Sequence, residues 1–285
     1  MTSKSALGQV ASRAMKVLAE PVPLRFQVVR ALDMAFDFMP YPAKLNLRSI
    51  DRPHFGHCLL HAALLAKRLG HKRISAIEFG VAGGNGLVSL ERHARLVEKE
   101  TGVATEIYGF DTGEGMPPAG DHRDVPYLFQ AGYYKMDIEK LKARLTTAKL
   151  CIGRVEDTVA TFFEREKPPP IGFMSIDVDY YSSTVPILKL LEAASPNLLP
   201  RVVCYLDDMA GDIDWAFNDF TGELLAVHEF NAAHADIKIA PVQGLRFVNN
   251  HIPQLWHEQV FVAHLFKHPD YGRNVNDRTE LPLRG

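Results

Sequence analysis

The sequence predicts an α/β protein with a seven-stranded, mostly parallel sheet, an antiparallel pair at one edge and a helical extension at its N-terminus. Three observations lead to this prediction. Short β-rich runs alternate with helical patterns from about residue 73, two later β-rich runs have no good helix between them, and helical patterns precede the first run. Alternation of this kind is typical of a parallel sheet covered by helices. A chain of 285 residues is long enough for one large domain of this type.

Seven apolar runs are predicted to form the strands. The five expected parallel strands cover residues 73–80, 105–111, 149–155, 171–177 and 201–207. Residues 236–241 and 258–266 follow each other directly, so we expect them to pair antiparallel at one edge. The strand boundaries follow from the pattern to within two to four residues.

Residues 1–70 are predicted to form a helical extension, with helices over 5–38 and 54–69. Phe55, Leu59 and Ala63 fall on one helical face, and Gly70 stands where a helix should end. We expect this extension to form a cap or the interface of a homo-oligomer, and residues 71–285 to form the ligand-binding domain. His54, His57 and His61 also have helical spacing, but without a nearby acid we do not favour a metal site there.

Composition argues against nucleic acid and membranes as partners. The chain has 32 Lys plus Arg and 34 Asp plus Glu, a net charge of -2, which provides no electrostatic attraction for polyanions. No apolar run approaches the roughly 20 residues of a membrane span, and the first residues lack the apolar centre of a signal peptide. We expect a cytoplasmic protein with a small-molecule ligand.

The glycine-rich turn EFGVAGGNG, residues 78–86, follows the first predicted strand. Ligands of open parallel sheets bind beyond the carboxyl ends of the strands, so Gly80 and Gly84 lie at the expected ligand site. The spacing differs from the G-x-G-x-x-G of dinucleotide folds, and the Glu78 carboxylate would oppose a pyrophosphate. A cationic cofactor such as S-adenosylmethionine (SAM) suits Glu78 better, although a tight turn without a ligand stays an alternative.

Asp111 ends the second predicted strand, where an acid can accept both hydroxyl groups of an adenosine ribose. This role is compatible with NAD as well as SAM, so the choice of SAM depends on Glu78.

Two acid pairs follow the fourth and fifth predicted strands: Asp177 with Asp179, and Asp207 with Asp208. Four carboxylates at one edge of a sheet require a compensating cation, and hard oxygen ligands suit Mg²⁺ or a similar ion. We assign Asp177, Asp207 and Asp208 to the metal and Asp179 to the base that removes a proton from a substrate hydroxyl. The alternative is that Asp179 caps the next helix while the other acids belong to loops.

Two further segments could shape the acceptor site. The segment 117–137 is too long for a simple connection and is either a lid or a solvated loop. Trp215 and its aromatic neighbours could form a wall of the acceptor pocket, although an aromatic helix facing the core is favoured slightly.

Several of these motifs together resemble class I SAM-dependent methyltransferases of the macrocin O-methyltransferase kind. The motifs are EFGV at 78–81, YGFDTGEGMP at 108–117, Gly153 with EDT at 156–158, DVDYYSST at 177–184 and LDD at 206–208. The resemblance covers residues 73–210 and implies a Rossmann-like fold, SAM as cofactor, a divalent metal and a sugar hydroxyl as acceptor.

By position, the resemblance carries cofactor binding to Glu78, Gly80, Gly84 and Asp111, and it supports the metal and base assignments made above. Val155 and Asp177 complete the predicted cofactor-binding set. We therefore expect a metal-assisted O-methyltransferase acting on a small sugar-like or polyol-like molecule. An NAD-dependent oxidoreductase and a non-catalytic cofactor-binding protein remain alternatives.

Overall fold

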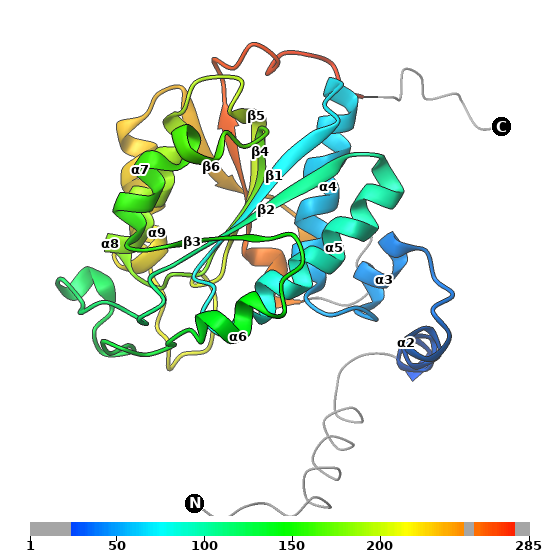
Figure 1. Cartoon of the computed structure of the whole chain (residues 1–285), viewed down its shortest axis with the longest axis horizontal. Helices are drawn as coiled ribbons and strands as arrows, with labels where there is room; N and C mark the ends of the chain where they lie inside the picture. The colour runs from blue at the N-terminus through cyan, green and yellow to red at the C-terminus, as the bar shows by residue number, and fades with distance from the viewer. Residues whose placement is uncertain (1–23, 248–253, 277–285) are drawn as a thin grey trace, which may run out of the picture.

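A seven-stranded sheet forms the centre of the molecule in a computed structural model that describes residues 24–247 and 254–276 (Figure 1). The strands are β1 (Arg73–Phe79), β2 (Ala104–Asp111), β3 (Lys149–Ile152), β4 (Ile171–Ile176), β5 (Leu198–Leu206), β6 (Ile237–Pro241) and β7 (Val260–Leu265). Their order across the sheet is β3-β2-β1-β4-β5-β7-β6. The first five strands of this order, from β3 to β5 and including β2, β1 and β4, run parallel to one another. The strand β7 is antiparallel to both β5 and β6. The predicted fold class and the antiparallel edge pair are confirmed.

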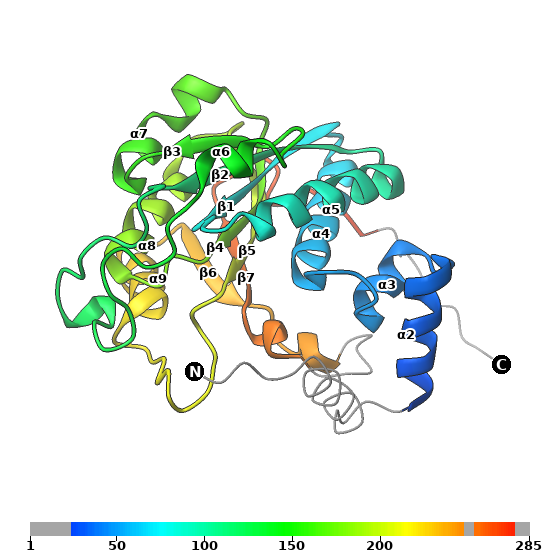
Figure 2. The same cartoon turned by 60° about the horizontal axis from the view of Figure 1, so that its bottom comes forward.

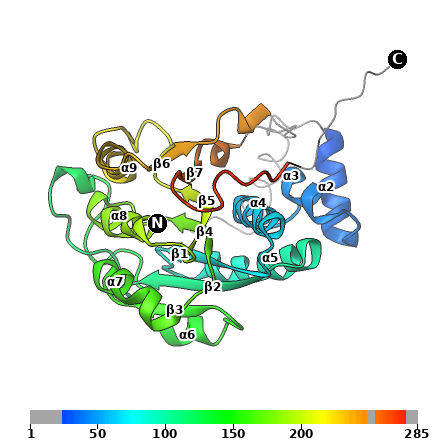
Figure 3. The ribbon, with the colours of Figure 1, turned by 90° about the horizontal axis from the view of Figure 1, so that it is seen from above.

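Helices cover both faces of the sheet (Figure 3). On one face lie α4 (Pro53–Leu69) and α5 (Asn85–Thr101), together with the short α6 (Ile138–Lys142). On the other face lie α7 (Val155–Glu166), α8 (Tyr181–Leu188) and α9 (Gly222–Ala233). Short 3₁₀ turns occur at η1 (His122–Asp124), η2 (Lys189–Glu192), η3 (Leu245–Phe247) and η4 (Leu255–Glu258). Each face of the sheet therefore has its own apolar core, and the loops lie at the ends of the strands.

The register of the central strands brings their carboxyl ends to one edge. Phe79 of β1 pairs with Ile176 of β4, which pairs with Leu206 of β5. The next residue along each chain segment therefore enters a loop at the same level of the sheet. This alignment places the glycine turn and both acid pairs beside one another.

The strand β3 is shorter than predicted: a strand was expected over 149–155, and only Lys149–Ile152 forms one. Gly153 has a φ of 143°, which few other residues adopt, and the chain turns there. Val155 then begins α7 instead of ending a strand.

The N-terminal helices differ in their relation to the sheet. α4 agrees with the predicted helix over 54–69, ends at Gly70 as expected, and buries Phe55 and Leu59 in the core that it shares with α5. Ahead of it, α2 (Leu24–Phe36) forms the end of the predicted 5–38 helix and stops where the chain takes a left-handed turn at Asp37, and α3 (Tyr41–Leu47) is a further helix that was not predicted. Figure 2 shows these two helices beyond α4, on the side away from the sheet.

The predicted division of the chain at residue 70 and the predicted oligomer interface stay predictions. Residues 5–23 of the expected first helix lie outside the described residues. Across the described part of the chain, no helix has both the length and the apolar character needed to cross a membrane.

Candidate functional site

A cavity of about 790 Å³ lies at the carboxyl ends of β1, β2, β4 and β5, and we call it the crevice. The glycine turn after β1, the start of α7 and the loops after β2, β4 and β5 line it. Four of the six predicted cofactor-binding residues line the crevice: Gly80, Asp111, Val155 and Asp177. These four residues therefore lie around one continuous cavity.

Gly80 is the point where the turns after β1 and β4 come closest. Its φ is 83°, and a Cβ at this position would overlap the backbone carbonyl oxygen of Asp177. Only glycine meets both conditions, because it tolerates positive φ and has no side chain to collide. This residue therefore fixes the distance between the predicted cofactor turn and the first acid pair.

Asp111 holds the glycine turn in place from the neighbouring strand. Its Oδ2 accepts a hydrogen bond of 2.8 Å from the amide of Ala82, and its Oδ1 accepts one of 2.7 Å from the amide of Gly113. Each carboxylate oxygen has a second lone pair, so Asp111 can still accept the two hydroxyl groups of a ribose.

Glu78 and Gly84 do not line the crevice. The Glu78 carboxylate is buried against Gly86 at the start of α5, and its Oε2 has no hydrogen-bond partner among the described residues. Burial raises the pKa of this carboxyl well above its usual value. Gly84 takes the left-handed conformation that starts α5 and packs against Leu141. Cofactor binding by these two residues stays a prediction.

All four predicted acids, Asp177, Asp179, Asp207 and Asp208, line the crevice. Burial and the charges of Asp207 and Asp208 raise the pKa of Asp177. Burial and the charge of Asp177 raise the pKa of Asp179 to about 7. Burial and the neighbouring carboxylates likewise raise the pKa of Asp208. The acids are therefore close enough to repel one another, as the strand register requires.

The turn that carries Asp179 is held by backbone hydrogen bonds to carboxylates from other elements. Asp179 itself has a φ of 59°, an unusual backbone conformation for a residue with a side chain. Its amide donates to Asp208 Oδ2 at 3.0 Å, and the amide of Val178 donates to Glu223 Oε1 at 3.4 Å. The amide of Ser182 donates to Asp124 Oδ1 at 2.8 Å. These three acceptors fix where the predicted base stands.

Glu223 and Asp124 are two residues of the site that sequence reasoning missed. Glu223, in the first turn of α9, is fully buried, and it also accepts from the amide of Asp208 at 3.3 Å. It therefore ties the loop after β4 to the loop after β5. The only sequence signal was an acid at a helix start, which is too common to single out.

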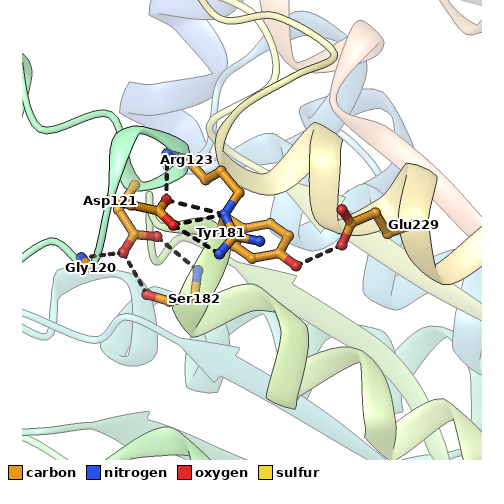
Figure 4. A network of polar contacts seen from close by, with 7 residues as sticks. Gly120, Asp121, Arg123, Tyr181, Ser182 and Glu229 are labelled. Carbon is orange, nitrogen blue, oxygen red and sulfur yellow. Dashed lines mark hydrogen bonds and ion pairs between the residues drawn. The ribbon is translucent and has the colours of Figure 1, made fainter.

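Asp124 connects the loop after β2 to α8. Besides the Ser182 amide, it accepts from the Ser182 hydroxyl at 2.9 Å and from the Gly120 amide at 2.8 Å. Beside it, Arg123 pairs with Asp121 and lies 4.4 Å from the centre of the Tyr181 ring. Figure 4 shows this network between the loop and the start of α8. The segment 117–137 is thus anchored to α8 and lines part of the crevice, although most of its residues are exposed, and its role as a lid stays a prediction.

Aromatic side chains complete the crevice above the acids. Phe129 and Tyr134 from the segment 117–137 and Trp215 from the loop after β5 all line it. The Phe129 and Trp215 rings lie 6.3 Å apart, and the Tyr127 hydroxyl donates to the Trp215 carbonyl oxygen at 3.4 Å. The favoured helix around Trp215 is wrong, because the segment forms turns there and its residue Ala216 has a φ of 51°. Trp215 is instead part of the wall.

The acids fit a hard divalent cation in chemical type, since they are carboxylates that lack a compensating charge. In their present positions, however, no three His, Cys, Asp or Glu side chains of residues 24–247 and 254–276 are arranged to hold a metal ion. Asp207 Oδ1 accepts from the Tyr205 hydroxyl at 2.7 Å, and Asp208 Oδ2 accepts from the Asp179 amide. The metal assignment therefore stays a prediction.

Comparison with known proteins gives similarities among solved structures only. No protein-family model and no curated protein matches this sequence. The structure of CalS11, a calicheamicin methyltransferase, is 21% identical over 86% of this chain and 92% of that chain, with a TM-score of 0.49.

Two further structures are similar over most of their length. An O-methyltransferase from Bacillus cereus, solved with SAH, is 15% identical over 89% of this chain and 96% of that chain, with a TM-score of 0.38. The O-methyltransferase TomG from Streptomyces achromogenes, solved with SAM, is 14% identical over 89% of this chain and 94% of that chain, with a TM-score of 0.40.

All three structures are of proteins named as methyltransferases. At these identities and TM-scores, the reaction of this chain has to be assigned from its own residues.

Proposed function

We propose that this protein is a SAM-dependent O-methyltransferase that acts on a hydroxyl group of a small molecule with the help of a divalent cation such as Mg²⁺. One observation carries the proposal. A single crevice has a glycine turn and a ribose-type acid on one side and a cluster of carboxylates on the other. The first half suits an adenosine cofactor, and the second half suits a cation and an acidic hydroxyl.

The topology supports one orientation of the cofactor in the crevice. With its ribose at Asp111 on β2, the adenine would lie toward β3 and Val155, and the amino-acid end toward β1 and β4. The reactive methyl group would then face the acid cluster.

SAM would supply an electrophilic methyl group, and a divalent cation would be held by Asp177, Asp207 and Asp208 and would lower the pKa of a nearby hydroxyl. Asp179 is the base that takes the hydroxyl proton. Asp179 lies in the crevice with the three proposed metal ligands, so it can reach a hydroxyl group that the cation acidifies. Glu223 and Asp124 keep Asp179 in place through the backbone of its turn.

The acceptor is proposed to be a sugar or another polyol. Carboxylates can accept hydrogen bonds from several hydroxyl groups, while Trp215, Tyr134 and Phe129 offer apolar ring faces for the C–H side of such a ring. The docked lid would hold the acceptor in line with the methyl group and exclude water.

The test is calorimetric titration of the purified protein with SAH and separately with NAD, each with Mg²⁺ and after chelation. We expect SAH to bind at micromolar strength and NAD not to bind. D111N should weaken SAH at least tenfold, because the ribose loses a charged acceptor. Binding of NAD without SAH would favour an oxidoreductase and overturn the proposal.

The non-catalytic alternative needs a second measurement. Labelled SAM, Mg²⁺ and a panel of nucleotide sugars and simple polyols should give methyl transfer that chelation abolishes. SAH binding that is indifferent to Mg²⁺, together with the absence of transfer in this panel and in cell extract, would favour a protein that binds the cofactor without turnover.

A further inference from the structure

Tyr205, near the end of β5, holds the side chain of Asp207 from outside the acid cluster. Its hydroxyl donates a hydrogen bond of 2.7 Å to Asp207 Oδ1, and Tyr205 itself is only 4% exposed. The two side chains meet because residues two positions apart along an extended chain point to the same side. Asp207 lines the crevice, so a buried hydroxyl sets the direction of one of the carboxylates that face this cavity.

Gln259, directly before β7, ties Tyr205 and the backbone of Asp207 together. Its side chain is buried, its Oε1 lies 3.0 Å from the Tyr205 hydroxyl oxygen, and its Nε2 donates to the carbonyl oxygen of Asp207. The backbone carbonyl oxygen of Gln259 also accepts from the amide of Leu206 at 3.0 Å. The end of β5 is therefore fixed from β7 by one side chain and one backbone group.

The helix α4 fixes the ring of Tyr205. The His54 ring stacks on it, with centroids 4.6 Å apart and 27° between the planes, and the Phe55 ring meets it edge-on at 6.1 Å. On the backbone, the amide of Asp207 donates to the carbonyl oxygen of Ile176 at 3.0 Å. Because both the ring and the backbone are held, the hydrogen bond between Tyr205 and Asp207 joins two fixed points.

This hydrogen bond is compatible with a ligand on Asp207. A carboxylate has two oxygens and about four lone pairs, so a donor at Oδ1 still allows a cation at Oδ2. Asp208 differs, because its Oδ2 accepts from the amide of Asp179, within the acid cluster itself. The orientation of Asp207 therefore depends on a hydroxyl that a single substitution can remove without touching the other acids.

We propose that Tyr205 is a positioning residue that orients Asp207 for the divalent cation. This inference rests on the cation of the proposed function, and it extends the site to a residue that does not line the crevice. Tyr205 acts only through Asp207. A carboxylate that is already fixed loses little side-chain freedom when a cation binds, so its orientation raises the affinity.

The experiment compares two buried tyrosines that make the same kind of hydrogen bond. Calorimetric titration of the full chain with MgCl₂ would be carried out on the wild type, Y205F and Y108F. Tyr108 of β2 is the matched control, because it is fully buried and its hydroxyl donates to Glu106 Oε2 at 2.8 Å, also across two positions. Neither Tyr108 nor Glu106 lines the crevice. Each variant loses one hydroxyl that donates to a carboxylate and keeps its aromatic ring.

We expect Y205F to weaken Mg²⁺ binding about 10- to 100-fold, the usual effect of removing a group that orients a metal ligand, and Y108F to change it less than twofold. SAH binding in chelator should change less than twofold in both variants. A double-mutant cycle with D207N then tests the route of the effect. In the D207N protein, Y205F should weaken Mg²⁺ by less than a further twofold, because the carboxylate on which it acts is gone.

Several results would overturn the inference. Equal Mg²⁺ affinity of Y205F and the wild type would show that Asp207 needs no support from Tyr205. A full additional loss in the D207N background, or a joint loss of Mg²⁺ and SAH binding in Y205F, would show that Tyr205 supports the fold only. A wild type that binds SAH but no Mg²⁺ would remove the cation from the proposed function and this inference with it, whereas a wild type that binds neither would overturn the proposed function as a whole.

Discussion

The crevice and the layer formed by α4 and α5, which we call the α4 layer, both bury titratable side chains, but burial shifts their pKa values in opposite directions. In the crevice, burial and like charges raise the pKa of Asp177, Asp179 and Asp208, and these acids face one another. In the α4 layer, burial lowers the pKa of His57 to about 3 and that of His93 to about 4. The histidines are therefore neutral at pH 7, whereas the acids compete for protons.

This difference separates a structural role from a functional one. A neutral imidazole packs and hydrogen-bonds like other polar side chains, and His57 lies 5.2 Å from the Trp256 ring while His93 bridges Tyr41 and Asp51. Mutually repelling acids reduce stability, so their presence at one edge of the sheet requires another explanation. A cation and a reacting hydroxyl would provide it.

The two regions also have opposite pH dependence. A histidine whose pKa is lowered by folding is protonated first in the unfolded state, so stability is lost as pH falls below about 6.5. An acid whose pKa is raised by folding is protonated first in the folded state, so stability is lost as pH rises above about 4. Variants that remove one group of each kind should therefore show opposite trends.

The largest effect is expected at Gly80, where the crevice depends on close backbone approach. G80A would place a methyl group on the Asp177 carbonyl oxygen and strain a residue with a φ of 83°. We expect the free energy of unfolding to fall by about 3 to 5 kcal/mol, the range of severe steric substitutions, with loss of SAH binding. Urea unfolding and calorimetry would measure both.

Gly83 in the same turn provides the control. It is exposed, and a Cβ there would meet nothing within 4 Å. G83A should change stability by less than about 1 kcal/mol. Equal effects of G80A and G83A would contradict the view that the Gly80 contact sets the crevice.

The next effect concerns the α4 layer. H93Q keeps a donor and an acceptor but removes the titration, so the variant should lose less stability in acid than the wild type. Relative to the wild type, H93Q should gain about 2 kcal/mol between pH 8 and pH 5, because one pKa unit corresponds to about 1.4 kcal/mol and the pKa of His93 is about 4. Urea unfolding at several pH values measures this difference.

Y41F is the matched variant for this histidine. It removes the hydroxyl that donates to His93 Nδ1 but leaves the imidazole. Its loss of stability, about 1 kcal/mol for one hydrogen bond, should be nearly the same at pH 8 and pH 5. Parallel pH profiles for H93Q and the wild type would show that the buried histidine does not control acid stability.

In the crevice we expect a change in stability of similar size but with the opposite pH dependence. D208N removes one of the competing carboxylates and keeps an oxygen that can accept from the Asp179 amide. In chelator, the variant should be about 2 kcal/mol more stable than the wild type at pH 8, with the gain disappearing near pH 4 where the acids are protonated. D219N, in the exposed part of the same loop, should show no such gain. A D208N protein less stable than the wild type at pH 8 would mean that the acids are not in conflict.

The comparison also explains what could be predicted from the sequence. Strand ends follow from the apolar runs, and parallel strands have their carboxyl ends at the same edge of a sheet, so the positions of Asp111, Asp177 and Asp207 at one edge were predictable. The burial of a side chain at a strand end was not predictable, because it depends on which helix covers that side of the strand. Glu78 is buried against Gly86 of α5, whereas Gly80, in the turn after β1, lines the crevice.

Contacts between distant segments were the part that sequence reasoning could not supply. Asp124 reaches Ser182 across 58 positions, and Glu223 reaches Val178 across 45. Neither acid belongs to a periodic pattern or a recognisable motif, and each acts through the backbone of another loop.

The smallest effect, and the one that decides how the acids are compensated, is stabilisation by Mg²⁺. A cation that binds only the folded protein stabilises it by about 1.4 kcal/mol at a tenfold excess over its Kd. Protons compete for the same carboxylates, so the Mg²⁺-dependent shift in melting temperature should be larger at pH 8 than at pH 5. D208N should reduce this shift, whereas H93Q should leave it unchanged because His93 does not line the crevice. Equal shifts in wild type and D208N would place the cation elsewhere, and the carboxylates of the crevice would then serve the acceptor hydroxyls alone.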